Sequence, residues 1–184
     1  MADVLGKLRP ETAALLVIDV QDRLLPAISE AEQRVEYIRR MIEAAKVLQV
    51  PILATEQYPA GLGRTCETIQ SCLEGITYIE KMSFSACEQR LIDRLAELDR
   101  SQIIVVGIEA HVCVQQTTLD LLRMGYAVYV CTDAVGSRRT LDAAVAFERM
   151  RQAGAIVTTT ESVTFELLGR AGTEAFKKIL PIVK

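Results

Sequence analysis

Gln102 to Gly107, with the sequence QIIVVG, decides the fold of this 184-residue chain. The four residues after Gln102 are all β-branched and apolar, without the alternation of a strand that has one face in water. Such a run is typical of a strand buried on both faces, as in a parallel sheet covered by helices on each side. Ala13 to Asp19, with the sequence AALLVID, has the same character. The sequence therefore predicts a parallel sheet that contains both stretches.

Outward from these strands, short apolar runs alternate with longer amphipathic segments. We expect further strands at residues 51–56, 76–81, 126–131 and 156–160, a loop at 58–63, and helices at 29–49, 86–98, 113–124, 139–153 and 173–180. This alternation is typical of βαβ units. The predicted fold class is α/β, a three-layer, Rossmann-like sandwich with a six-stranded, mostly parallel sheet flanked by helices. No repeat or linker interrupts the pattern, so residues 1–184 are expected to form a single domain.

The composition argues against nucleic acid and membranes as partners. Half of the residues are apolar, the formal net charge is −3, and aromatic residues make up 5% with no Trp. A basic surface and a base-stacking platform are therefore not expected. Met1 to Leu15 lacks the basic start and apolar block of a signal peptide, and no apolar run approaches the roughly 20 residues that span a bilayer. We expect a cytoplasmic protein that binds a small molecule.

The cysteines and the single histidine argue against a metal site. The chain has five cysteines, an odd number without a CxxC pair, and its one histidine is His111. These features favour reduced thiols in the cytosol and leave almost no ligands for a Cys/His zinc site. We predict that the protein uses neither a metal ion nor a cofactor.

Three chemically useful side chains follow predicted strands. In open parallel sheets, ligands bind beyond the carboxyl ends of the strands, where Asp19, Lys81 and Cys113 are expected. A helix start favours a thiolate at Cys113, Asp19 can accept the thiol proton, and the Lys81 ammonium can stabilise a thiolate and an oxyanion. The set suits covalent attack on a carbonyl group. A cysteine at a helix start that serves only packing remains the alternative.

Three segments carry a resemblance to a known family. They are LVIDVQ at Leu16–Gln21, Lys81 with Ser83-Phe84-Ser85, and GIEAHVCV at Gly107–Val114. In this order they resemble the motifs of the isochorismatase-like cysteine hydrolases, and the likeness runs from about residue 12 to 168. It implies a six-stranded parallel sheet and Asp19, Lys81 and Cys113 as a catalytic triad. It also implies a cis peptide at Ile108–Glu109 and an oxyanion hole of backbone N–H groups around Ile108, Glu109, Ala110 and Cys113.

Departures from the family pattern narrow the expected reaction. Ala110-His111 replaces the Thr-Asp of many members, and Thr55 to Gly63 holds no histidine where nicotinamidases carry metal ligands. True isochorismatases lack the nucleophilic cysteine, so Cys113 argues against vinyl-ether hydrolysis. The chain looks most like the isochorismatase-domain-containing branch.

The substrate pocket is expected to involve Gln57, Tyr58 and His111. Each also fits an ordinary loop position, and His111 fits a solvent-facing one. Arg138 and Arg139 can hold a substrate carboxylate or simply solvate a helix start, and the sequence leaves these roles open.

The leading hypothesis is therefore a hydrolase of small amides that works through a thioester on Cys113. Three alternatives stay open: an isochorismate-like vinyl-ether hydrolase, a non-catalytic scaffold or interaction protein, and a thiol redox protein. The apolar content and the habit of the family also predict a homo-oligomer, at least a dimer.

Overall fold

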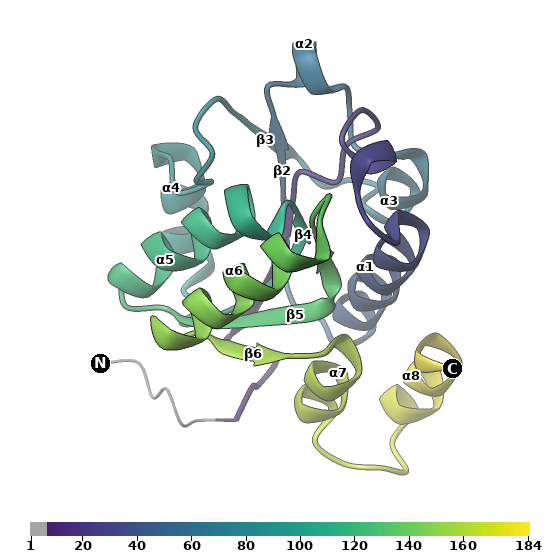
Figure 1. The fold of residues 1–184 in the computed structure, drawn as a ribbon. Helices are drawn as coiled ribbons and strands as arrows, with labels where there is room; N and C mark the ends of the chain where they lie inside the picture. Colours follow the sequence, from purple (N-terminus) through teal and green to yellow (C-terminus); the bar gives the residue numbers. More distant parts are fainter. Residues whose placement is uncertain (1–6) are drawn as a thin grey trace.

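The computed structural model describes residues 7–184. Residues 1–6, which belong to the N-terminal segment expected to lack a signal peptide, lie outside the described residues. Six strands form one parallel sheet in the order β3-β2-β1-β4-β5-β6 (Figure 1). The strands are β1 (Ala13–Ile18), β2 (Ile52–Gln57), β3 (Tyr78–Lys81), β4 (Gln102–Ile108), β5 (Ala127–Gly136) and β6 (Ile156–Thr158). The predicted α/β class with a six-stranded parallel sheet is confirmed.

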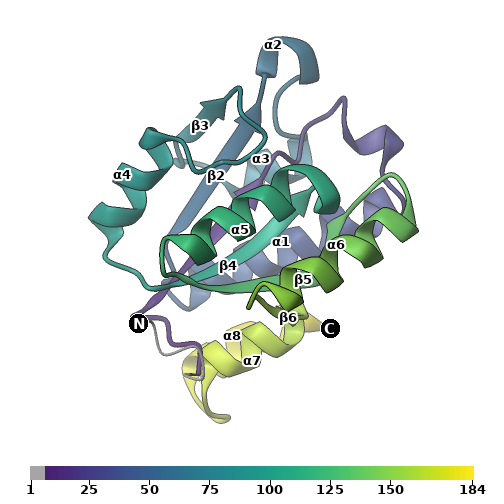
Figure 2. The ribbon, with the colours of Figure 1, turned by 60° about the vertical axis from the view of Figure 1, so that its left-hand side comes forward.

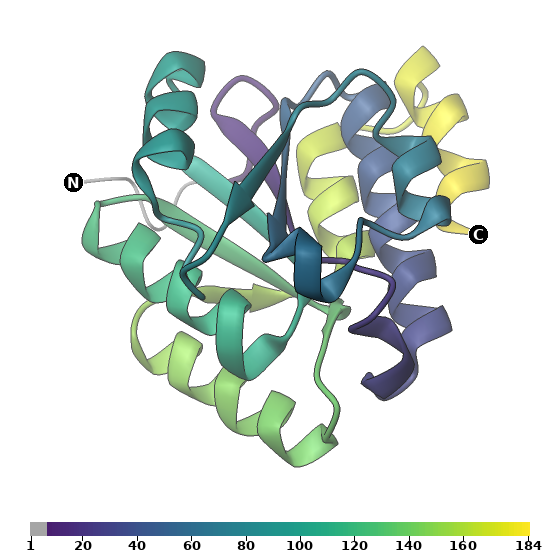
Figure 3. The same ribbon diagram turned by 90° about the horizontal axis from the view of Figure 1, so that it is seen from above.

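Helices cover both faces of the sheet, as Figure 3 shows from above. One layer contains α4 (Gln89–Leu98), α5 (Gln115–Arg123) and α6 (Thr140–Gln152). The other contains α1 (Ala31–Val47), α3 (Glu67–Cys72), α7 (Thr160–Leu168) and α8 (Glu174–Val183). Two short helices, at Leu25–Ala27 and α2 (Pro59–Leu62), lie in connecting segments, and Figure 2 shows α2 beyond the end of β2.

The two central strands explain the unalternating apolar sequences. Every residue of β1 and β4 is buried. Within β1, Leu15 and Val17 pack toward α1, whereas Leu16 and Ile18 pack toward the layer of α4 and α5. Because both faces of these strands are covered, apolar side chains are favoured at every position.

The strand order reverses between β1 and β4, which is where open α/β sheets bind their ligands. Ile18 and Gly107 lie opposite one another at this point. Gly107 has a φ of +128°, and a Cβ atom there would lie 2.1 Å from the carbonyl oxygen of Ile18. The close approach of the two strands therefore requires glycine.

Some elements differ from those expected. The strand predicted to end at Cys131 continues to Gly136, with a register irregularity opposite Val105–Gly107. Within it, the Asp133 carboxylate accepts hydrogen bonds from the N–H and hydroxyl of Thr160, at the start of the unpredicted helix α7. The unpredicted helix α3 and the short helix α2, which occupies part of the predicted loop 58–63, are further differences.

Candidate active site

Asp19 lies at the centre of a buried polar cluster at the carboxyl edge of the sheet. It follows β1 with a positive φ of 52°, a conformation that Asp tolerates better than most residues. Its Oδ1 accepts a 2.7 Å hydrogen bond from the Thr55 hydroxyl, and its Oδ2 accepts one of 2.7 Å from Lys81 Nζ. The side chains of Asp19 and Lys81 are both fully buried. A charge pair removed from water in this way needs good geometry and full hydrogen bonding to be tolerated.

Lys81, the last residue of β3, has four oxygen atoms around its ammonium group. Besides Asp19, they are Gln57 Oε1 at 2.7 Å and the carbonyl oxygens of Ser83 and Phe84 at 3.2 and 3.1 Å. An ammonium group has three protons, which these oxygen atoms and the Cys113 thiol share. The stabilisation of an oxyanion that the sequence suggested for Lys81 stays a prediction.

Cys113, which follows β4, completes the cluster. It lies in a π-helical turn, Ala110–Val114, between β4 and α5, and it is buried. Both Asp19 and Lys81 act on the thiol by charge and by hydrogen bonding. The pKa of the Cys113 thiol is raised to about 12: burial is the largest cause, Asp19 also raises the pKa, and Lys81 opposes the rise. The expectation of a helix start that favours the thiolate is therefore wrong for the resting protein, because burial and Asp19 outweigh it.

Two glutamines hold the cluster in place through hydrogen bonds. Gln57 accepts from Lys81 and donates through Nε2 to the Met82 carbonyl at 2.8 Å. Gln21, fully buried, accepts from the Gln57 N–H at 2.8 Å and donates to the carbonyls of Gln57 and Gly63. Sequence reasoning named Gln57 but missed Gln21 and Thr55 as members of the site. The sequence signal for both was a polar residue within, or just after, an apolar strand sequence.

A cavity of about 280 Å³ opens beside Cys113. It is lined by Leu24, Gln57, Leu62, Phe84, Glu109, Val112, Cys113 and Arg138. Of the three predicted pocket residues, the structure places Gln57 in this lining but neither Tyr58 nor His111. Tyr58 folds back over Gly61, where an added Cβ would lie 2.2 Å from its ring, and His111 Nδ1 lies 2.9 Å from the Ser137 hydroxyl.

Glu109 and Arg138 form an ion pair at the mouth of this cavity. Arg138 Nη2 donates to Glu109 Oε1 at 2.7 Å, and its Nε and backbone N–H donate to Oε2 at 3.1 and 3.2 Å. Burial raises the pKa of Glu109, but the hydrogen bonds from Arg138 outweigh this and hold it below its usual value. The Glu109 side chain is 6% exposed and that of Arg138 is 56% exposed.

The neighbouring predictions on this segment are resolved only in part. The Ile108–Glu109 peptide bond is cis, and Ile108 and Ala110 are buried. The oxyanion hole expected from these residues stays a prediction. Arg139 occupies the position before α6 and makes no side-chain capping bond.

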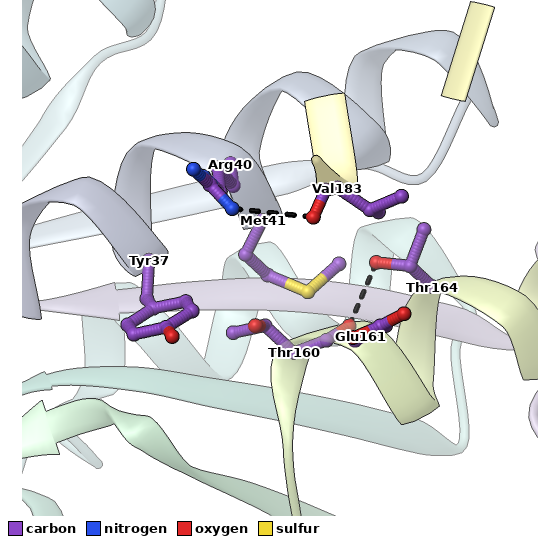
Figure 4. Close-up of a pocket in the computed structure, with 7 residues that line it drawn as sticks. All are labelled: Tyr37, Arg40, Met41, Thr160, Glu161, Thr164 and Val183. Atoms are coloured by element: carbon purple, nitrogen blue, oxygen red, sulfur yellow. Dashed lines mark hydrogen bonds between the residues drawn. The ribbon is translucent and has the colours of Figure 1, made fainter. Parts of the chain in front are cut away.

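A second, smaller cavity lies on the opposite helical layer, between α1, α7 and α8 (Figure 4). It has a volume of about 80 Å³ and is lined by Tyr37, Arg40, Met41, Thr160, Glu161, Thr164 and Val183. Arg40 donates to the Val183 carbonyl, and the Met41 side chain lies between α1 and the start of α7. Both threonine hydroxyls in this lining donate to other oxygen atoms, Thr160 to the Asp133 carboxylate and Thr164 to the Thr160 carbonyl.

Within residues 7–184, no three His, Cys, Asp or Glu side chains are grouped so that they could hold a metal ion. None of the helices in that range is long and apolar enough to cross a membrane.

Comparison with known proteins places this geometry in context. The isochorismatase domain model matches residues 13–162. Isochorismatase family protein 1B of Dictyostelium discoideum is 41% identical over 185 residues, covering 98% of this chain and 90% of that protein. A solved structure described as the MAR1 ribonuclease from Caenorhabditis elegans is 40% identical with a TM-score of 0.93, covering 97% of this chain and 92% of that one. The YcaC gene product of Escherichia coli, described as an octameric hydrolase of unknown specificity, is 24% identical with a TM-score of 0.88, covering 95% and 91% of the two chains; this likeness shows a shared fold.

Proposed function

Because the chain belongs to the isochorismatase domain family of hydrolases, we propose that it hydrolyses a small amide by nucleophilic catalysis, with Cys113 as the nucleophile. The observation that carries this proposal is the buried contact of the Cys113 thiol with a carboxylate that is itself held by Thr55 and Lys81. A nucleophile, a base and an orienting group within mutual reach are the parts that covalent catalysis needs.

Asp19 acts first as the general base in this reaction. It takes the proton from Cys113 Sγ as the sulfur attacks the amide carbonyl carbon, because the raised pKa of the thiol keeps it protonated at rest. The protonated Asp19 then gives the proton to the departing nitrogen, and the C–N bond breaks to release ammonia or an amine. A thioester on Cys113 remains.

Water completes the turnover. Asp19 takes a proton from a water molecule that attacks the thioester carbonyl, and the C–S bond breaks as the proton returns to sulfur. The net change is amide plus water to carboxylic acid plus amine, with no oxidant or cofactor. Backbone N–H groups around Ala110 and Cys113 stabilise the two oxyanions in this proposal, while Lys81 orients Asp19 and opposes the rise in the thiol pKa.

A substrate panel tests the proposal. Primary amides and carbamoyl compounds of few atoms are incubated with the protein, and ammonia release is measured beside vinyl-ether cleavage of isochorismate. Cys113→Ala should lower amide hydrolysis by about 10⁴-fold or more, whereas Cys87→Ala, which removes a thiol outside the cavity lining, should leave it unchanged. Amide hydrolysis that survives Cys113→Ala would contradict the proposed nucleophile.

The same panel includes a single-stranded RNA, since the Caenorhabditis elegans relative is described as a ribonuclease. We expect no cleavage by this chain, because its net charge is −3 and the cavity beside Cys113 is small and largely apolar. RNA cleavage that is lost in Cys113→Ala would overturn the amide assignment.

Assembly and location belong to the same proposal. We infer at least a dimer, supported by the octameric description of the YcaC protein with the same fold. Light scattering at micromolar concentration should give at least twice the monomer mass of 20.3 kDa. The five cysteines, all free in the structure, support a cytoplasmic location.

A further inference from the structure

The cations near the Cys113 cavity are already bound to protein oxygens. Lys81 is buried, and its three protons serve four oxygen atoms. Lys81 is also not among the residues that line the cavity, so it is not placed to bind a substrate carboxylate.

Arg138 is the one cation among the described residues that line the cavity. It is held by Glu109 through two side-chain contacts of 2.7 and 3.1 Å and one backbone contact of 3.2 Å. A substrate carboxylate could reach this guanidinium only by displacing Glu109 from it or by binding beside Glu109. Displacement would leave the nearly buried Glu109 carboxylate without its partner, and binding beside Glu109 would place two negative charges together.

The remaining walls offer little to a charged molecule. Four of the lining side chains are apolar, namely Leu24, Leu62, Phe84 and Val112. The Gln57 amide lines the cavity too, but it is neutral; its oxygen accepts from Lys81, and one of its two N–H groups donates to the Met82 carbonyl. The cavity is therefore apolar, balanced in charge and, at about 280 Å³, of a size for a small molecule.

We propose that Glu109 makes this site selective for uncharged substrates, by neutralising Arg138 so that small neutral amides with an apolar group are accepted and carboxylates are rejected. The inference rests on the proposed function, because it names the substrate class of the same site. It predicts that an anionic substrate such as isochorismate is excluded by charge and by the apolar walls.

Alkylation of Cys113 tests the selectivity without requiring turnover. The probes are iodoacetamide and iodoacetate, which have similar size and differ by one negative charge. Rates at the Cys113 peptide are measured by mass spectrometry at pH 9, and the ratio of the two rates is divided by the same ratio for free N-acetylcysteine. The wild-type protein should favour iodoacetamide by about tenfold after this correction.

The variants give the mechanism. Glu109→Gln frees the Arg138 charge with little change of shape, so the preference for iodoacetamide should fall about tenfold. Arg138→Gln should raise it, and because Arg138 is half exposed this second variant keeps the test valid if Glu109→Gln does not fold. Glu174→Gln, which removes the same charge from an exposed pair with Lys177 on α8, should leave the ratio unchanged.

A corrected ratio near one in the wild-type protein, or a ratio that Glu109→Gln and Arg138→Gln do not move in opposite directions, would overturn the inference. Labelling by neither reagent would overturn it as well, because the cavity would then not admit a small neutral molecule. The expected ratios in a protein that hydrolyses no amide would contradict the proposed function alone.

Discussion

Two ion pairs flank the Cys113 thiol, and they differ in their access to water. Asp19–Lys81 and Glu109–Arg138 have the same shortest N–O distance, 2.7 Å. Both side chains of the first pair are fully buried, whereas Arg138 in the second is 56% exposed. In the first pair, water has no access to either side chain. In the second, water can reach the guanidinium group, so the pair can change without opening the core.

This difference separates their roles. A buried pair is costly to break and well suited to holding a reacting group in one geometry. A pair at the mouth of a cavity contributes less to stability but sets the charge that an arriving molecule meets. The contrast predicts that equivalent changes in the two pairs have very different effects.

The largest effect is expected on turnover. Asp19→Asn keeps the shape of the side chain but removes proton acceptance, so amide hydrolysis should fall by roughly 10²–10⁴-fold. Glu109→Gln makes the same chemical change in the other pair and should lower hydrolysis of a neutral amide by less than about tenfold. Steady-state kinetics on one neutral amide compares the two variants. Equal losses would remove the distinction between the pairs.

Thiol titration sharpens the same comparison, because Asp19 raises and Lys81 lowers the pKa of Cys113. The rate of Cys113 alkylation in the wild-type protein should still be rising above pH 9, since the thiol pKa is about 12. Asp19→Asn should move the midpoint to lower pH and Lys81→Ala to higher pH. Unchanged midpoints in both variants would contradict the assignment of the triad, even if turnover fell.

A third prediction concerns stability. Lys81→Met leaves the Asp19 carboxylate buried without its cation and should lower the free energy of unfolding by about 3–5 kcal/mol. Arg138→Met should cost less, about 1–3 kcal/mol, because it leaves the nearly buried Glu109 carboxylate without its partner but also removes the exposed side chain that covers it, which lets water approach. Urea unfolding at pH 7 measures both. A loss for Arg138→Met as large as that for Lys81→Met would show that the exposed pair is structural.

The smallest effect is expected where the structure moved a predicted residue out of the site. His111→Ala should change kcat/KM for a neutral amide by less than about threefold, because His111 contacts Ser137 and does not line the cavity. Ser137→Ala, which removes the partner hydroxyl, is the matched control. A loss above tenfold in His111→Ala alone would return this histidine to the site.

The sequence predicted what depends on local pattern. Ala13–Asp19 and Gln102–Gly107 were identified as strands because burial on both faces leaves no alternation, and the strand ends then brought Asp19, Lys81 and Cys113 together. Helix α7 was missed although the Thr159 hydroxyl caps it locally by accepting from the Ser162 N–H; the Asp133 carboxylate, from the distant strand β5, adds hydrogen bonds at Thr160. The continuation of β5 past Cys131 was missed because it is held by a tertiary contact, the pairing of Val135 and Gly136 with Gly107 and Ile108 of β4.

The walls of the cavity were beyond prediction for a related reason. Leu24, Leu62 and Phe84 lie in connecting segments whose paths are set by tertiary contacts, such as those of Gln21 with Gly63. Arg138 was considered as a possible anchor for a carboxylate, but its bond to Glu109 joins residues 29 positions apart in the sequence. The thiol pKa likewise depends on burial, which a helix-start motif does not reveal.

The four contacts of Lys81 have a consequence for how the molecule opens. β3 is an edge strand of only four residues, and such strands ordinarily fray and exchange their amide hydrogens early. Here any separation of β3 from its neighbour would pull the ammonium group away from Asp19 and Gln57 at once. The amide hydrogens that join β3 to β2 should therefore exchange as slowly as those between β1 and β4, so that the edge of the sheet opens only when the whole protein unfolds.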